Sequence, residues 1–213
     1  MKKLKSMFRL EFLLNNEFKS NCTFVMSLVA ISLYVINPIK TREMCMYAML
    51  TSMIADLVLM DYNEWFSFVF KKYRLYVGML LFMVAHVIYI VCFSSMLSNF
   101  SIDFSKFFLN ILIYVLIAFG LISFSIAIAW KKSPLFRIAT IVYTVVINIV
   151  LFTMFVCADV LGGRYILAAI GIMFFAISDI CILIRETVCD NALVRKLIWI
   201  FYPIGQMFII CSI

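Results

Sequence analysis

Glycine, proline, histidine and charged residues are all scarce in this chain of 213 residues. Six glycines and three prolines leave the apolar runs almost uninterrupted, and charged residues make up only 14% of the chain. A soluble domain has about a quarter of its residues charged. With 66% hydrophobic residues, the composition excludes an ordinary soluble domain and indicates a membrane protein. Because the apolar runs are continuous rather than alternating, they favour helices over the strands of a barrel.

The scarcity of histidine and of short motifs excludes several classes of enzyme. His86 is the only histidine, so a zinc site built from three histidines is impossible. The seven cysteines include no C-x-x-C pair, which argues against a zinc cluster or a disulfide framework. The sequence also has no G-x-S-x-G elbow, no P-loop and no dinucleotide fingerprint. We therefore expect no metal site.

The apolar runs predict an all-α bundle of seven transmembrane helices. Their expected ranges are 22–38, 43–61, 75–97, 107–129, 135–158, 164–185 and 196–213. Ahead of them, residues 1–21 are basic and amphipathic, and we expect them to lie on the inner membrane surface. The predicted division is thus a surface segment over 1–21 and a transmembrane domain over 22–213.

The distribution of lysine and arginine predicts the orientation of the bundle. Of the 18 basic residues, 14 lie before the first span or in the second, fourth and sixth loops, and four lie in the other loops. Basic loops stay on the cytoplasmic side of a membrane. We therefore expect the N-terminus inside, the C-terminus outside and an odd number of spans. Because the net charge of +7 lies between apolar runs, it does not indicate a nucleic-acid partner.

Two aspartates, Asp56 and Asp179, lie within apolar runs, where a charge is costly. A carboxylate in hydrocarbon costs several kcal/mol, so an intramembrane acid is by default a candidate functional group. Both runs are expected to pass from outside to inside, which places the two acids at a similar depth. The alternative is that each acid is a structural group satisfied by hydrogen bonds or an ion pair.

Other polar side chains are predicted to gather near the two acids. They are His86 and Tyr89 on the third span, Tyr143 and Asn148 on the fifth, and Tyr202 and Gln206 on the seventh. We expect these groups to surround one polar cavity in the inner half of the bilayer. Each also has a structural interpretation, because polar side chains often hydrogen-bond neighbouring helices together.

Two buried carboxyls suit proton-transfer chemistry. In a low dielectric a close pair can hold a single proton at neutral pH, which supplies one acid and one base. Such a pair can protonate an enol-ether carbon and direct water at the oxocarbenium ion, much as the carboxylates of glycosidases act on a similar ion. The same pair can instead carry protons in a transporter or bind a small molecule.

The polar residues follow a recognisable order along the chain. They are Asp56 in SMIADLVLM, Ala85, His86 and Tyr89 in LFMVAHVIYI, Tyr143 in IVYTVVINIVLFTM, Phe175, Ser178 and Asp179 in IGIMFFAISDICIL, and Tyr202 and Gln206 in FYPIGQMFII. This order resembles the YhhN family of membrane proteins, which includes the animal lysoplasmalogenases. The family pattern has G-D-x-x-L, A-H-x-x-Y and F-x-x-S-D helices and a closing helix with Tyr and Gln. Here Ala55 stands in place of the usual Gly, and we count seven spans where the family usually has eight.

The resemblance implies an integral-membrane hydrolase that cleaves the vinyl-ether bond of a lysoplasmalogen. The products would be a fatty aldehyde and a glycerophospho-alcohol, and the reaction needs water but no cofactor. Asp56 and Asp179 match the two family aspartates, one acting as the acid while the other activates water. The residues expected to bind substrate or orient water are His86, Tyr89, Tyr143, Ser178, Tyr202 and Gln206. The implied partner is a lysophospholipid within the bilayer, and the expected location is a bacterial plasma membrane.

Overall fold

The computed structural model describes residues 16–60, 73–98, 100 and 104–213, and the regular structure in these ranges is entirely helical. The helices are α2 (Asn16–Ile36), α3 (Lys40–Met60), α5 (Arg74–Leu97), α6 (Phe104–Ala129), α7 (Pro134–Leu161), α8 (Tyr165–Thr187) and α9 (Ala192–Cys211). Within the described ranges, seven helices are long and apolar enough to cross a membrane. The predicted all-α membrane bundle is therefore confirmed.

Helices α2 and α9 begin farthest ahead of the starts that the hydropathy of the sequence predicts. The first span was expected from residue 22 and the last from residue 196, but α2 begins at Asn16 and α9 at Ala192. The mostly polar residues 16–21 extend α2 ahead of its apolar part, and Asn191 caps α9 by accepting a hydrogen bond from the Val194 amide at 2.9 Å. The expected surface segment lies mostly in residues 1–15, outside the described residues.

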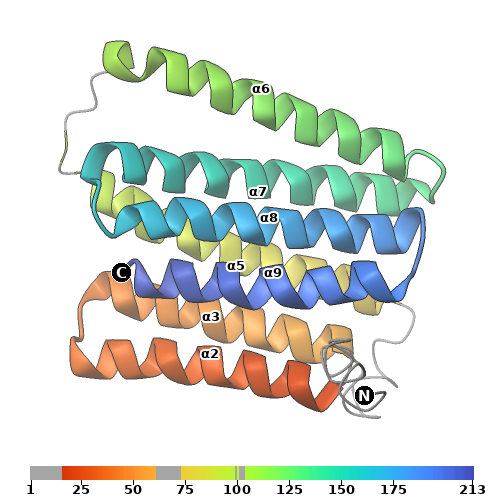
Figure 1. Ribbon diagram of the computed structural model, residues 1–213, viewed down its shortest axis with the longest axis horizontal. Coiled ribbons are helices and arrows are strands. Elements are labelled where there is room, and N and C mark those ends of the chain that lie inside the picture. Colours follow the sequence, from red (N-terminus) through yellow and green to blue (C-terminus); the bar gives the residue numbers. More distant parts are fainter. Residues whose placement is uncertain (1–15, 61–72, 99, 101–103) are drawn as a thin grey trace, which may run out of the picture.

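Consecutive helices run in opposite directions, and α2 and α6 lie at opposite edges of the bundle (Figure 1). Helices α2, α5, α7 and α9 all begin at one end of the bundle, which we call the proximal end. The last helix consequently finishes at the other, distal end. The start of α2 and the end of α9 thus lie at opposite ends of the bundle, as the odd number of spans predicted from the sequence requires. The side of the membrane that each end faces stays a prediction from the charges.

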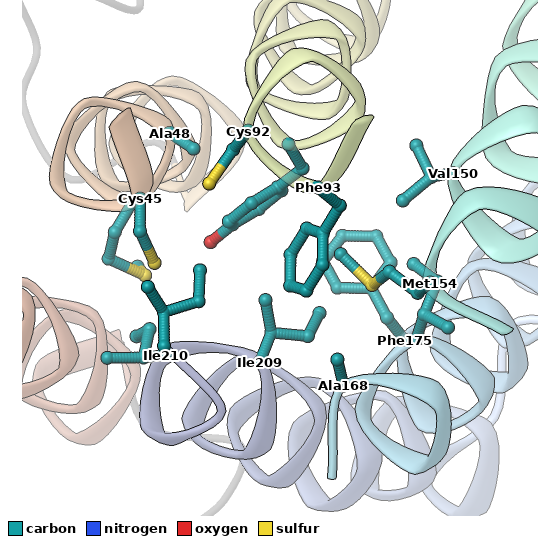
Figure 2. Packing of buried hydrophobic residues seen from close by; sticks show 14 of the residues in the cluster. Cys45, Ala48, Cys92, Phe93, Val150, Met154, Ala168, Phe175, Ile209 and Ile210 are labelled. Carbon is teal, nitrogen blue, oxygen red and sulfur yellow. The ribbon is translucent and has the colours of Figure 1, made fainter. Parts of the chain in front are cut away.

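The core lies between α3, α5, α7, α8 and α9. Figure 2 shows side chains from all five helices directed into a common interior, among them Ala48, Phe93, Met154, Phe175 and Ile209. All five are almost completely buried. Because lipid is as apolar as these side chains, close van der Waals packing rather than the hydrophobic effect holds membrane helices together. This packing fixes how each helix is rotated, and hence where its polar side chains point.

Helices α8 and α9 form the closest crossing, at Gly171 and Gly205. A Cβ atom built on either glycine would lie 2.7 Å from the carbonyl oxygen of the other. Small residues at such crossings let two backbones approach closely in a membrane. The crossing holds α8, which carries Asp179, against the part of α9 that carries Tyr202 and Gln206.

At the distal end, the Arg42 side chain joins three parts of the chain. Its Nη1 donates to the Leu33 carbonyl at 3.0 Å, and its Nε donates to the Ile213 carbonyl at 3.3 Å. The Leu33 carbonyl lies in the last turn of α2 and also accepts from the Asn37 amide at 3.2 Å, and Ile213 follows the end of α9. Arg42 thus ties the α2–α3 connection to the final residues of the chain.

Candidate functional site

Asp56 is held between α2 and α9 by two hydroxyl donors. Its Oδ2 accepts hydrogen bonds from Tyr202 Oη at 2.5 Å and from Thr23 Oγ1 at 3.0 Å. The side chain is buried, with 5% of the residue surface exposed. In hydrocarbon an acid without hydrogen bonds would be strongly destabilising, and these two donors supply them.

A second link, which joins α3, α5 and α9, lies one turn farther toward the distal end. Tyr89 Oη donates to Gln206 Oε1 at 3.0 Å, and Gln206 Nε2 donates to Ser52 Oγ at 3.5 Å. Ser52 precedes Asp56 by four residues on α3, and Gln206 follows Tyr202 by four on α9, so each pair occupies one helix face. We call the set Thr23, Ser52, Asp56, Tyr89, Tyr202 and Gln206 the buried ladder.

Asp179 has a different environment, in the wall of an internal cavity. Its Oδ2 accepts a hydrogen bond from Tyr143 Oη at 2.9 Å, and its side chain is only partly buried. The cavity has a volume of about 90 Å³. Most of its lining is apolar and comes from five helices: Leu59, Leu75, Met79, Phe82, Leu121, Phe136, Ile147, Ala176, Ile180, Ile182 and Leu183. The polar members of the lining are Ser125, Thr140, Tyr143, Thr144, Asp179 and Glu186.

A layer of aromatic rings separates the cavity from the buried ladder. The His86 ring lies 4.8 Å from the Phe175 ring and 6.0 Å from the Tyr143 ring, centroid to centroid. Phe175 lies 5.5 Å from Tyr202, and Phe82 lies 6.0 Å from both Phe175 and Tyr202. The rings connect the phenol that binds Asp179 to the phenol that binds Asp56.

The structure therefore divides the predicted site residues into two groups rather than one polar cavity. Asp179 and Tyr143 line the cavity, whereas Asp56, Tyr89, Tyr202 and Gln206 belong to the buried ladder. The two remaining residues bond backbone carbonyls.

One of these two is His86, which lies in the aromatic layer. Its Nδ1 is 2.5 Å from the Phe82 carbonyl oxygen, and since that oxygen only accepts, Nδ1 carries the hydrogen. The other is Ser178, which points away from the cavity. Its Oγ donates to the Ile198 carbonyl on α9 at 3.4 Å. The His86 hydrogen bond lies within α5, whereas the Ser178 hydrogen bond joins α8 to α9.

Comparison with known protein families matches residues 17–213 to the YhhN family, which is nearly the whole chain. The chain belongs to the YhhN family. The comparison with curated proteins and the comparison with solved structures each gave no match. Family membership agrees with the seven apolar helices and identifies a multi-pass integral membrane protein.

Several polar residues of this YhhN protein escaped the sequence reasoning. Thr23, which donates a hydrogen bond to Asp56, lies on α2, a helix on which the sequence predicted no site residue. Thr140 and Thr144 are four residues apart on α7, a spacing that places them on one helix face. That interval was the available signal, but single threonines in apolar runs carry no charge and drew no attention.

Charged side chains of this YhhN protein meet at the proximal end. Arg185 bonds Glu186 at 2.6 Å, Arg195 bonds Asp190 at 2.5 Å, and Lys19 Nζ lies 5.7 Å from the Trp199 ring centroid. The hydrogen bond from Arg195 lowers the pKa of the Asp190 carboxyl in the α8–α9 loop. Over the described ranges, Asp56 and Asp179 take part in no ion pair, and no three metal-binding side chains cluster.

Proposed function

We propose that this YhhN protein is a membrane hydrolase that cleaves the vinyl-ether bond of a lysoplasmalogen, with Asp179 as the group that transfers protons. The observation that carries this proposal is the Asp179 carboxyl in the wall of a mostly apolar cavity. An apolar cavity with a few convergent polar groups is the usual form of a ligand site. The resemblance of the polar residues to the lysoplasmalogenase pattern supports the choice of substrate.

The cavity is layered in a way that suits a single-chain ether lipid. Residues nearest the proximal end, such as Phe136 and Glu186, lie in the first or last turn of their helices. Asp179 and Tyr143 lie deeper along α8 and α7, and Ile147 lies deeper still. A lipid that entered tail first from the proximal end would place its chain among apolar side chains. Its ether bond would then lie near Asp179 and its polar head near Glu186 and Arg185.

The proposed reaction adds one water molecule and uses the Asp179 carboxyl twice. In its protonated form Asp179 donates a proton to the alkenyl carbon one removed from the ether carbon, and the double-bond electrons form the new C–H bond. Water then adds to the oxocarbenium carbon and returns a proton to the Asp179 carboxylate. The resulting hemiacetal breaks its C–O bond as the hydroxyl proton passes to the departing alcohol oxygen, which leaves an aldehyde.

We assign Asp56 an indirect part, because it does not line the cavity. A negative charge on Asp56 would stabilise the nearby oxocarbenium ion across the aromatic layer. The Phe82 ring, which lines the cavity, would add cation–π stabilisation. His86 and Phe175 would hold the Tyr143 and Tyr202 rings in place. On this assignment Asp179 contacts substrate, and Asp56 and His86 are positioning residues.

The size of the cavity sets a condition on substrate entry. A volume of about 90 Å³ is smaller than that of an apolar cavity of about 150 Å³ that binds benzene, so it holds the reacting segment but not a whole fatty chain. The wall formed by α6 is the one best placed to move. It packs mainly on α7 and is the least buried of the seven described spans. We expect α6 to separate from α8 when a lipid enters.

The test is release of fatty aldehyde from lysoplasmenyl lipid by the purified protein in detergent. Removing a general acid typically costs about 100- to 10,000-fold in rate, and we expect a loss in this range for Asp179→Asn. Asp56→Asn should cause a smaller loss. Asp159→Asn is the matched control, because Asp159 bonds Asn110 and Tyr114 near the distal end of α7, away from the cavity.

Three results would contradict the proposal. Folded wild-type protein that releases no aldehyde excludes the reaction. Full activity in Asp179→Asn excludes the assigned proton donor, and an equal loss in Asp159→Asn shows that the effect is not specific to the cavity. The proton-coupled transporter considered from the sequence predicts pH-dependent uptake of a solute or lipid without any aldehyde.

A further inference from the structure

A stripe of polar side chains on α7 faces the cavity beside Asp179. Thr140 and Thr144 line the cavity, as does Ser125 of α6. Thr144 Oγ1 donates to the Thr140 carbonyl at 2.8 Å and lies 3.2 Å from Ser125 Oγ. These two hydroxyls therefore already have protein partners, which is the usual state of polar groups between membrane helices.

The Thr140 hydroxyl differs from its neighbours. A helical threonine commonly donates to the carbonyl four residues earlier, as Thr144 and Thr153 of the same helix do. Thr140 Oγ1 is buried, only 4% of the residue is exposed, and the oxygen has no hydrogen-bond partner among the described residues. Because buried polar groups are nearly always bonded, an unpartnered hydroxyl in a cavity wall points to a ligand group.

Thr140 lies where the alcohol part of the proposed substrate would be. It precedes Tyr143 by three residues, a rise of about 4.5 Å along α7 toward the proximal end. Tyr143 in turn bonds Asp179. In a glycerol ether lipid with a free second position, the carbon that bears this hydroxyl is only two atoms from the ether oxygen. A lipid with its ether bond at Asp179 and its head toward Glu186 would thus bring that hydroxyl to the level of Thr140.

We propose that Thr140 forms a subsite for the free hydroxyl that adjoins the scissile ether bond. This inference rests on the proposed function and adds a residue that determines specificity. Thr140 would select lipids that carry a free hydroxyl at the second glycerol carbon. Lipids in which this hydroxyl is acylated or replaced by hydrogen would bind less well. A site built to bond a hydroxyl discriminates strongly against an analogue that lacks it, because its own polar group is then left unpaired.

The experiment measures kcat/KM for two vinyl-ether lipids, one with the hydroxyl and one with hydrogen in its place. Wild-type protein should prefer the hydroxyl substrate by about tenfold, the effect of one neutral hydrogen bond. Thr140→Val should lose about tenfold on the hydroxyl substrate and almost nothing on the deoxy substrate, since the bond is already absent there. Thr140→Ser should restore the preference. Thr153→Val is the matched control, because Thr153 lies on the same helix but outside the cavity lining.

An equal loss on both substrates in Thr140→Val would show a structural role and overturn the proposal. So would a wild-type protein that does not distinguish the two lipids, a comparison that needs no variant.

A binding arm separates this inference from the proposed reaction. The probes are the saturated 1-alkyl lysophospholipid and its 2-deoxy counterpart, neither of which carries a vinyl ether. If wild type releases no aldehyde but binds the hydroxyl probe about tenfold more tightly, and Thr140→Val abolishes that difference, the subsite stands although the reaction fails. Equal affinities for both probes overturn the subsite.

Discussion

Substituting alanine for Gly205 tests whether the α8–α9 crossing holds the candidate site together. The added Cβ would lie 2.7 Å from the Gly171 carbonyl oxygen and 2.9 Å from the Phe175 amide nitrogen, whereas ordinary contacts begin at 3.4 Å. Both neighbours are backbone atoms and cannot rotate away. The helices must therefore separate by about 0.7 Å at this point, the difference between the ordinary contact and the shorter distance.

Overpacking of this kind costs about 1–3 kcal/mol in well-packed proteins. In a chain of this size each kcal/mol corresponds to about 2–4 °C in Tm, so we expect a decrease of roughly 2–12 °C. Gly171→Ala should behave similarly, because its Cβ would meet the Gly205 carbonyl at the same distance. The separation would also move Tyr202, which lies three residues before Gly205 on α9, relative to Asp56.

A thiol-reactive fluorescent dye gives a suitable unfolding assay in detergent. Cys45, Cys92 and Cys157 are buried and should react only on unfolding, while the exposed Cys189 and Cys211 give a constant background. Gly120→Ala is the matched control, because nothing lies within 4 Å of its added Cβ on α6. If Gly171→Ala and Gly205→Ala both have the same Tm as Gly120→Ala, the close crossing of α8 and α9 does not stabilise the fold.

Three further predictions concern other parts of the fold. Tyr202→Phe removes one of the two hydrogen-bond donors to Asp56 and should lower the free energy of unfolding by about 1–3 kcal/mol. Tyr47→Phe is the control, because the Tyr47 hydroxyl is exposed, and its free energy of unfolding should not change. Equal free energies of unfolding in the two variants would argue against the buried ladder. Arg42→Gln loses the hydrogen bonds to the Leu33 and Ile213 carbonyls. Its Tm should be several degrees lower than that of Arg42→Lys, which keeps the positive charge. Identical Tm values in the two variants would show that neither hydrogen bond contributes to stability. Ala176→Leu should fill part of the cavity and reduce the rate of aldehyde release at least tenfold, with little loss of Tm. Ala127→Leu, on the exposed face of α6, should leave the rate unchanged. An unchanged rate in Ala176→Leu would show that the substrate does not enter this cavity.

The sequence predicted the candidate acids through the cost of a charge in hydrocarbon. That cost depends only on the local run of apolar residues, so Asp56 and Asp179 could be found without knowing their neighbours. The same reasoning passed over Thr23 and Thr140, because a hydroxyl in a membrane helix is cheap and common. Only the contacts of these residues distinguish them: one bonds Asp56, and the other faces a cavity without a partner.

By itself the sequence determined the number and type of the helices in the described ranges, because hydropathy and helix length are properties of each segment alone. It also carried the order of polar residues by which the chain resembles the YhhN family. The tertiary structure alone decided that Asp179 lines a cavity while Asp56 lies behind an aromatic layer. The physical reason is that the rotation and spacing of each helix depend on packing between distant segments, such as the contact of Gly171 with Gly205.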